Sequence, residues 1–403
     1  MLRLVSRITI TQVTVTEQWP VRNETFIFNF VNDVEIESSW ANLTDTCKII
    51  LPKKVKVFDQ YGTSVNLVGK SLLGDANTNP IMLRGDKIKV ELGYVYPTAS
   101  NPEVKELNTC FEGYITRINP RIPIVLWCED RMYQLKQIKV INKVYSNLVY
   151  SVQDMIQEML LQQPETKDIV LITGSSIGEK IETNINDEFR TQDDTIASVL
   201  SRLKKEAHLN SYFRKVKQSD GTFADELRCS GIVYFPSDRV KSVFSFQKNI
   251  ISDSLEYRRQ DDIKMGAKCY SLNKVEIGNG TNKNGTPKVK HKRLETFVGE
   301  KDGDLRTLFF WDIQTEKELK VLGERELRKF YYTGFFGSFE TFGIPKVKHG
   351  DEVLIEDAIL PERNGSYLVK GVHTNFGMNG FRQNIELHLK LSVFTQQQID
   401  QGL

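Results

Sequence analysis

The sequence has little that would tie it to a disulfide framework or a metal. Its 403 residues include five cysteines and five histidines. The cysteines are Cys47, Cys110, Cys128, Cys229 and Cys269. Their number is odd and no two form a C-x-x-C pair, so neither a disulfide framework nor a zinc knuckle is indicated. We expect them to be small buried residues in a chain that folds in a reducing cytoplasm.

The sequence also lacks a charge excess and a long apolar run. Lys and Arg number 54 against 52 Asp and Glu, a net charge of +2, whereas a dedicated nucleic-acid clamp would be strongly basic. No run approaches the ~20 apolar residues of a membrane span. Residues 1–9 are too polar and too regularly alternating for a signal peptide and predict a strand. We therefore expect neither stable membrane insertion nor secretion by the usual route.

One motif would suit a serine hydrolase. Residues Gly174 to Gly178 match G-x-S-x-G around Ser176 and follow an expected buried strand at 168–173, as a nucleophile elbow does. Asp187 and His208 follow in the order that such an enzyme uses. The elbow must open a helix, however, and residues 179–184 lack an apolar stripe. A Gly/Ser turn is the preferred interpretation, and a hydrolase stays an alternative.

Other site patterns are weaker still. Gly69-Lys70-Ser71 has Ser64 where a P-loop needs glycine, and the histidines form no i, i+4 pair. The basic run 288–293 lies beside a low-complexity stretch, 278–287, that we expect to be a mobile loop. The run could contact phosphate, but a solvated surface segment is the simpler expectation. We predict no catalytic, cofactor or metal site, and no enzyme.

Repetition is what the sequence does contain. Arg84-Gly85-Asp86 begins a segment, 84–90, that recurs at 349–355 with Gly350 and Asp351 in the same places. Each copy is followed by a pair of alternating strands, 110–118 with 122–130 and 365–372 with 380–389. A β-module used twice can present a repeated face to its neighbours.

The glycines and aspartates of this module have plain local roles. Gly85 and Gly350 should supply the backbone freedom of a turn, and Asp86 and Asp351 should accept hydrogen bonds from nearby N–H groups.

Further candidates lie in the second copy. Gly343 and Pro345 form a turn ahead of it. Gly377 and Gly380 bracket a hairpin turn, after which Arg382 and Gln383 begin the return strand. For all ten residues a turn or packing role and a partner-interface role both remain open.

The order of patterns predicts a mainly β chain with an α+β insert. Short strands between turns up to residue 139 are typical of a barrel or sandwich. Residues 140–262 predict an α+β middle domain, with one helix after Ser151 and another after Thr195. The β pattern resumes over 263–395, with a helix at about 315–331 that starts in a capping box, and 396–403 form a frayed tail.

These elements resemble a known family. The matching stretches are 343–345, 350–353, 367–377 and 380–387, together with 111–116 and 127–136 near the end of the first module. They are similar to the baseplate hub proteins of contractile phage tails, which include the late control protein D family and the hub half of type VI secretion tip proteins. The first copy departs from the second in having no counterpart of the helix at 315–331.

The resemblance implies two tail-tube-like β-barrels separated by the α+β domain, and a homotrimer. Three chains would offer six similar barrels, so that a threefold central spike can join a sixfold tail tube around a channel for tape measure protein and DNA. Tail tube protein, spike protein, tape measure protein and other baseplate proteins would be the partners. No needle or lysozyme domain follows residue 403, so the spike would be a separate protein. The location implied is the virion tail baseplate, assembled in the bacterial cytoplasm.

A β-rich receptor- or glycan-binding tail protein is a further alternative. Such a protein should carry aromatic clusters at loop tips. Here most aromatic residues lie within strand or helix patterns, apart from Phe335-Phe336.

Overall fold

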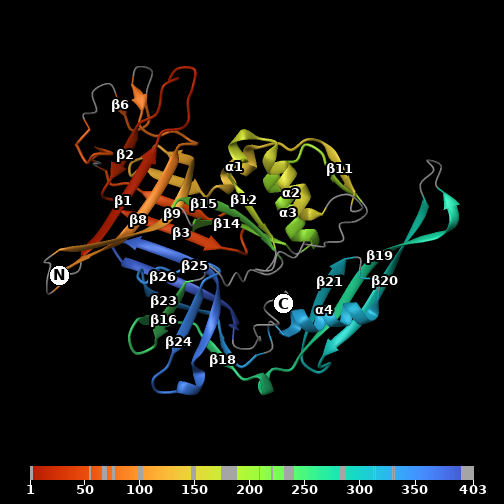
Figure 1. Ribbon diagram of the computed structural model, residues 1–403. Coiled ribbons are helices and arrows are strands. Elements are labelled where there is room, and N and C mark those ends of the chain that lie inside the picture. The colour runs from red at the N-terminus through yellow and green to blue at the C-terminus, as the bar shows by residue number, and fades with distance from the viewer. Residues whose placement is uncertain are drawn as a thin grey trace.

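Strands dominate the computed structural model. It describes residues 3–53, 56–65, 70–74, 78–98, 103–146, 151–173, 188–207, 209–218, 221–230, 240–281, 287–311, 313, 315–328, 330 and 332–391. A single 14-stranded sheet extends through the N-terminal and C-terminal β regions (Figure 1). The main path of the sheet is β17-β23-β26-β25-β3-β4-β10-β9-β8-β1-β2-β5, with β24 beside β25 and β16 beside β24.

The N-terminal region supplies the strands on one side of this sheet. They are β1 (Arg3–Thr11), β2 (Thr25–Phe28), β3 (Asp33–Ser39), β4 (Thr46–Ile50), β5 (Phe58–Asp59), β8 (Lys87–Tyr96), β9 (Val104–Asn119) and β10 (Val125–Glu129). A separate short pair is β6 (Lys70–Ser71) with β7 (Asn79–Pro80). Alternation buries Ile8 and Ile10 of β1 on the same face, as a period of two requires.

The C-terminal region supplies the other side of the sheet. Its strands are β16 (Lys241–Ser245), β17 (Ile250–Asp253), β23 (Ser338–Phe342), β24 (Glu352–Glu356), β25 (Gly365–Gly377) and β26 (Gly380–Lys390). The predicted boundary at residue 262 left β16 and β17 in the middle segment, but their hydrogen bonds to β24 and β23 place them in this sheet.

The middle segment is α+β. Its elements are α1 (Met132–Gln137), β11 (Lys143–Ser146), α2 (Val152–Leu161), β12 (Val170–Thr173), β13 (Glu188–Thr191), α3 (Ile196–Ala207), β14 (Asn210–Lys217) and β15 (Phe223–Ser230). The predicted face of α2 is confirmed: its buried residues are Val152, Met155, Ile156, Met159 and Leu160. Ser151 forms a capping box with Asp154. The strand expected to be buried, β12, is only partly so, with Val170 42% exposed.

A third unit projects from the C-terminal region. β19 (Met265–Thr281) pairs with β20 (Pro287–Gly299) and β21 (Asp304–Trp311), and α4 (Glu316–Arg328) packs on the resulting sheet. Figure 1 shows the long β19–β20 pair extending away from the large sheet, and β18 (Glu256–Arg258) and β22 (Gly334–Phe336) pair at its base. Residues 278–281, expected in a loop, extend β19, and the basic run 288–293 lies in β20.

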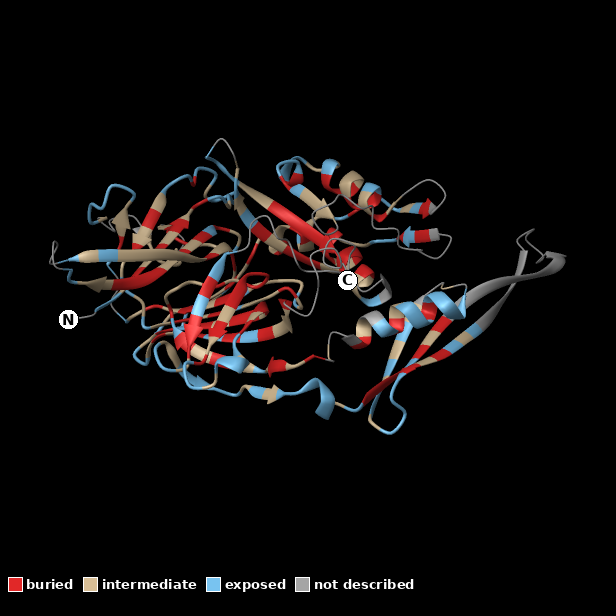
Figure 2. Ribbon diagram, turned by 60° about the horizontal axis from the view of Figure 1, so that its bottom comes forward, coloured by how far each residue is buried: buried red, intermediate tan, exposed pale blue. Residues whose placement is uncertain are grey.

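Burial follows the same division into units. Figure 2 shows buried positions concentrated along the strands of the large sheet and on one side of α4. Four of the cysteines are buried, as predicted, whereas Cys110 is half-buried, and all five are free thiols. Among the described residues, no helix is long and apolar enough to span a membrane, and no group of three or more His, Cys, Asp or Glu side chains could hold a metal ion.

Both halves of the large sheet have the same strand order. The N-terminal half has the order β1-β8-β9-β10-β4-β3, and the C-terminal half has β16-β24-β25-β26-β23-β17. When β2 and β5, which extend the N-terminal half beyond β1, are left out and the other strands are numbered along the chain within each half, the two orders are identical. One difference is that β1 and β8 are antiparallel whereas β16 and β24 are parallel. The repeated segments of the sequence therefore belong to a repeated sheet topology.

Candidate assembly interface

The first Gly-Asp turn is held by a fixed set of hydrogen bonds. Gly85 has φ +95°, in the left-handed region that favours glycine. Its N–H donates to the carbonyl of Ile115 at 2.7 Å, and the Ile115 N–H donates to the carbonyl of Asp86 at 3.0 Å. The buried Asp86 carboxylate accepts from the Leu83 N–H at 2.7 Å and forms an ion pair with Arg22 at 2.7 Å.

The second turn repeats this arrangement. Gly350 has φ +81°. Its N–H donates to the carbonyl of Val369 at 2.9 Å, and the Val369 N–H donates to the carbonyl of Asp351 at 3.0 Å. The Asp351 carboxylate accepts from the Lys348 N–H at 2.9 Å and pairs with Arg214 at 2.6 Å. Arg214 lies on β14, so this copy ties the middle segment to the C-terminal sheet.

A β-bulge lies at the same place in both modules. The pairing of β9 with β10 skips Thr116, and the pairing of β25 with β26 skips Lys370. Each skipped residue directly follows the residue that bonds to the Gly-Asp turn, Ile115 or Val369. Because a bulge sets local bend and twist, the two modules curve at equivalent points.

The modules are joined by the pairing of β3 with β25. Seven residue pairs run from Gly371↔Ser39 to Gly377↔Asp33. A Cβ on Gly377 would lie 2.6 Å from a carboxylate oxygen of Asp33 and 2.9 Å from a backbone oxygen, so the close approach of the strands requires glycine. The Ser39 hydroxyl adds a hydrogen bond to the carbonyl of Lys370 at 3.0 Å.

The N-terminal core continues across this joint. Phe376 and Phe381, from β25 and β26, are buried among its residues. The Tyr94 hydroxyl of β8 donates to the carbonyl of Phe381 at 2.9 Å. Hydrogen bonds and apolar packing together make the joint a continuous structural element rather than a loose contact.

The remaining candidate residues shape the second module. The buried Gln383 side chain donates to the carbonyls of Phe342 and Pro345, both at 2.9 Å, and accepts from the Val347 N–H at 3.1 Å. A Cβ on Gly343 would lie 2.2 Å from the Phe381 ring. These side chains and this glycine fix the chain ahead of the second Gly-Asp turn.

Gly380 and Arg382 lie at the β25–β26 hairpin. Gly380 has φ +102° in the turn, and the Arg382 guanidinium lies 4.8 Å from the ring centroid of Phe342. A partner-interface role for these candidates stays a prediction.

Two backbone edges carry no strand partner among the described residues. One is the outer edge of β17 in the large sheet, continued by β18 in its separate pair with β22. The pairs β17–β23 and β18–β22 follow one register, Asp253↔Phe339 and Glu256↔Phe336. The other is the stretch of β9 at 117–119 on the side away from β10, beyond the end of β8. The equivalent of the β17 edge in the first module is β3, and the equivalent of the β9 edge in the second module is β25. These two strands pair with each other.

Exposed apolar side chains lie at one end of the joined strands. Phe30 precedes β3, Ile122 lies between β9 and β10, Met378 between β25 and β26, and Phe342 ends β23. Their exposed fractions are 72%, 67%, 101% and 38%. Registers Asp33↔Gly377, Asp33↔Ile50 and Val125↔Ile50 put these tips along one end of the sheet. We call these four residues the apolar rim.

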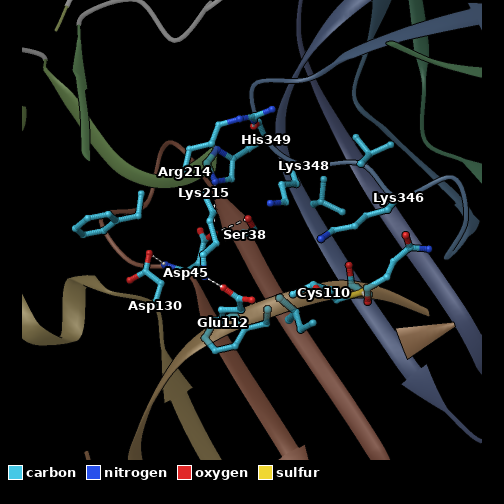
Figure 3. A pocket seen from close by; sticks show the side chains of 18 of the residues that line it. Ser38, Asp45, Cys110, Glu112, Asp130, Arg214, Lys215, Lys346, Lys348 and His349 are labelled. Carbon is cyan, nitrogen blue, oxygen red and sulfur yellow. Dashed lines mark hydrogen bonds and ion pairs between the residues drawn. The ribbon is translucent and has the colours of Figure 1, made fainter. Parts of the chain in front are cut away.

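A cavity of about 560 Å³ lies where the three parts of the chain meet. Figure 3 shows side chains from β9, β14 and residues 346–349 directed into it. His349 is buried, and its Nε2 lies 3.4 Å from Asp45, which also accepts a hydrogen bond of 2.7 Å from Ser38. Burial, and next the Asp45 carboxylate, raise the pKa of Asp130.

No motif in the sequence predicts this cavity. His349 occupies the place of Arg84 in the repeat. Its carboxylate partner, Asp45, is 304 positions away and joins it only through the folded sheet. No local pattern could have indicated the pair.

The G-x-S-x-G motif at Gly174–Gly178, Asp187 and His208 lie outside the described residues. Of the tripeptide Gly69-Lys70-Ser71, the last two residues form β6.

Comparisons with known proteins place the fold. No protein-family model and no curated protein sequence matches the chain. Among solved structures, it is similar to a tail protein from Neisseria meningitidis MC58, at 12% identity and a TM-score of 0.54 over 96% of both chains. It is also similar to the 43 kDa tail protein of prophage MuSo2 from Shewanella oneidensis, at 12% identity and a TM-score of 0.53 over 96% of both chains.

A further similarity is to a chain of the Francisella PdpA–VgrG complex in its lidded form, with 9% identity and a TM-score of 0.52. That match covers 98% of this chain and 53% of the other. The predicted resemblance is thus confirmed at the level of structure: this chain has the fold of phage tail proteins and of a VgrG-complex chain.

Proposed function

We propose that the chain is a structural baseplate hub of a contractile phage tail or a related injection system. Each half of the large sheet would curve into a tail-tube-like barrel, and three chains would form a ring of six such modules. The ring would join a sixfold tail tube to a threefold spike and leave a channel for tape measure protein and DNA. Its place would be the tail baseplate of the virion, with no enzymatic role.

The observation that carries this proposal is the joint between β3 and β25. In the second module, residues 252–258 occupy the place of Asp33–Ser39 in the first, because both stretches pair with equivalent strands at equivalent positions. In the first module, the stretch that starts at Arg117 occupies the place of the stretch that starts at Gly371, counted from the Gly-Asp turns. The joint used within the chain can therefore be made again between chains.

This equivalence fixes a register for the contact between copies. Glu37 pairs with His373 within the chain, and the corresponding pair would be Glu256 with Asn119 of a second copy. Glu256 is exposed and forms an ion pair with Arg258 at 2.6 Å. The same register would place Arg258 opposite Arg117 of the second copy, so Glu256 would lie close to both guanidinium groups. A head-to-tail contact of this kind closes into a ring when its rotation divides a full turn, and it covers strand edges that would otherwise aggregate.

Cysteine cross-linking tests this register. The double variant Glu256→Cys/Asn119→Cys should form disulfide-linked trimers on mild oxidation, because directly opposite Cβ atoms in a sheet lie within disulfide reach. Glu37→Cys/His373→Cys is the matched control and should cross-link within the chain, without a change of mass. Glu256→Cys/Ile118→Cys is shifted by one residue, which turns the two side chains to opposite faces. Equal intermolecular cross-linking in this shifted variant, or none in the first, would refute the predicted joint.

A further inference from the structure

The two equivalent hairpins, β9–β10 and β25–β26, end at one level of the large sheet. β9 is paired with β10 as far as Asn119, opposite Val125, and β25 is paired with β26 as far as Gly377. Val125 also lies opposite Ile50 in β4. Asp33 in β3 lies opposite both Ile50 and Gly377. Because directly opposite residues lie side by side, the turns of both hairpins lie at the same end of the sheet and at a similar level.

Each of these turns carries an exposed apolar side chain. Ile122 lies between β9 and β10 and is 67% exposed, and Met378 lies between β25 and β26 and is fully exposed. Apolar side chains scattered singly over a surface need no explanation. These two are not scattered, because they occupy equivalent places in a repeated strand order. Three chains arranged as proposed would present six such tips.

The parts of the chain that are not repeated leave the sheet at its other end. β10 runs from Val125, at the level of the turns, to Glu129, and the middle segment follows directly with α1. β17 likewise starts at Ile250, opposite the end of β23 that lies beside the second turn, and leads through β18 to the β19–β21 unit. Figure 1 shows both of these appendages on one side of the large sheet.

Symmetry then distinguishes the two faces of the proposed ring. Modules that join through strand edges place their strand ends on the two flat faces of the ring. One face would present the repeated turns six times, and the other would present each appendage three times. A partner of six like subunits can make the same contact with every module only on the first face. Six apolar tips suit a ring with six apolar sockets, because burial of apolar area stabilises association.

We propose that the turns at Ile122 and Met378 dock the sixfold tail tube, and that the opposite face of the ring receives the threefold spike. This inference rests on the proposed hub function. It adds the direction in which the hub is inserted between its two partners and the side chains that make the tube contact.

Tube binding by single variants tests the proposal. Ile122→Asp and Met378→Asp should each weaken the affinity of the trimer for assembled tail tube at least tenfold, because each places charge in three of the six apolar contacts. Their affinity for spike protein should stay within about twofold of that of the unaltered chain. Ile359→Asp is the matched control: this side chain is 75% exposed but lies between β24 and β25, at the opposite end of the sheet. It should leave tube binding unchanged.

Oxidation of Met378 gives a second readout on the unaltered chain. Because this side chain is fully exposed, hydrogen peroxide should convert it to the sulfoxide. Assembled tail tube should protect Met378 from oxidation, and spike protein should not, as measured by peptide mass spectrometry.

Three results would overturn the proposal: full tube binding by both variants, a loss confined to one of them, or protection of Met378 by spike protein alone. A loss confined to one variant would indicate a threefold contact at this face. The mass of each trimer, measured in the same samples, separates these results from a failure of the hub assignment. A chain that forms no trimer, or whose trimer binds neither tube nor spike, would contradict the proposed function itself.

Discussion

At the residue scale, two buried aspartates organise the repeat. The Asp86–Arg22 pair has no exposed side-chain surface, and Asp351–Arg214 has 5% and 8%. Removing one partner of such a pair leaves a buried charge uncompensated, which costs about 3–5 kcal/mol. The two turns therefore depend on their carboxylates far more than an exposed turn would.

Asp86→Asn should lower the free energy of unfolding by about 3 kcal/mol or more, because Arg22 loses its counter-charge. Denaturant unfolding measures this loss. Lys370→Met is the control: its ion pair with Glu386 is exposed, and its loss should cost about 1 kcal/mol or less. A cost for Asp86→Asn no greater than that of the control would contradict the role given to the turn.

Stability should depend on pH through Lys346. Burial, and next the charge of Lys348, lower the pKa of Lys346 to about 8, although Cys110, Asp351 and Glu112 act in the opposite direction. The unfolded chain binds this proton up to about pH 10.4, so the folded state is penalised below pH 8 and gains stability from about pH 8 to 10.4. Lys346→Met should raise the free energy of unfolding at pH 7 by about 1–2 kcal/mol, with solvent screening allowed for.

The gain from Lys346→Met should shrink as the pH rises from 8 towards 10, because over this range the lysine of the folded chain loses the proton whose burial penalises the folded state. Denaturant unfolding at pH 7, 9 and 10 measures the trend. A gain that is constant with pH would show that lost charge is not its cause.

At the element scale, the helices could be predicted and the sheet partners could not. The apolar spacing of α2 and its Ser151 cap are local signals, and so is the bond from the Glu318 N–H to the Thr315 hydroxyl at the start of α4. The pairing of β3 with β25 joins residues more than 330 positions apart, and no periodicity encodes such a partner.

The sequence pattern also failed to predict the length of β19 and β20. Their Gly- and Asn-rich end has loop composition, yet β19 continues to Thr281, which pairs with Pro287 after a shift in register beyond Glu276. Gly350 and Asp351 of the second module were predicted from the repeat alone. The cavity at the junction was not, because its groups come from three separate segments.

The apolar rim should serve association rather than folding. Ile122 and Met378 are at exposed hairpin tips, so Ile122→Asp/Met378→Asp should change the free energy of unfolding by about 0.5 kcal/mol or less. The same variant should fail to bind an adjoining tail ring, because it places charge in an apolar contact. Co-sedimentation with assembled tail tube, and separately with spike protein, measures the binding. Unaltered binding to both would exclude the rim from the assembly contacts.

At the scale of the whole molecule, the proposed hub would use the duplicated module to let three chains imitate six subunits. Both halves share a strand order, a turn with its buried aspartate, and a bulge, and the chain contains one example of the joint between modules. In the proposed assembly, repeating that joint between copies would generate the ring without any new kind of contact. The middle segment and the β19–β21 unit would then be carried on the ring as appendages.

The mass and symmetry of the purified chain test this account most directly. Light scattering at micromolar concentration should give three times the 46.3 kDa of one chain, and electron micrographs should show a ring of six similar lobes with threefold symmetry and an open centre. A monomer that persists at these concentrations and does not form rings with tail tube protein would contradict the central claim.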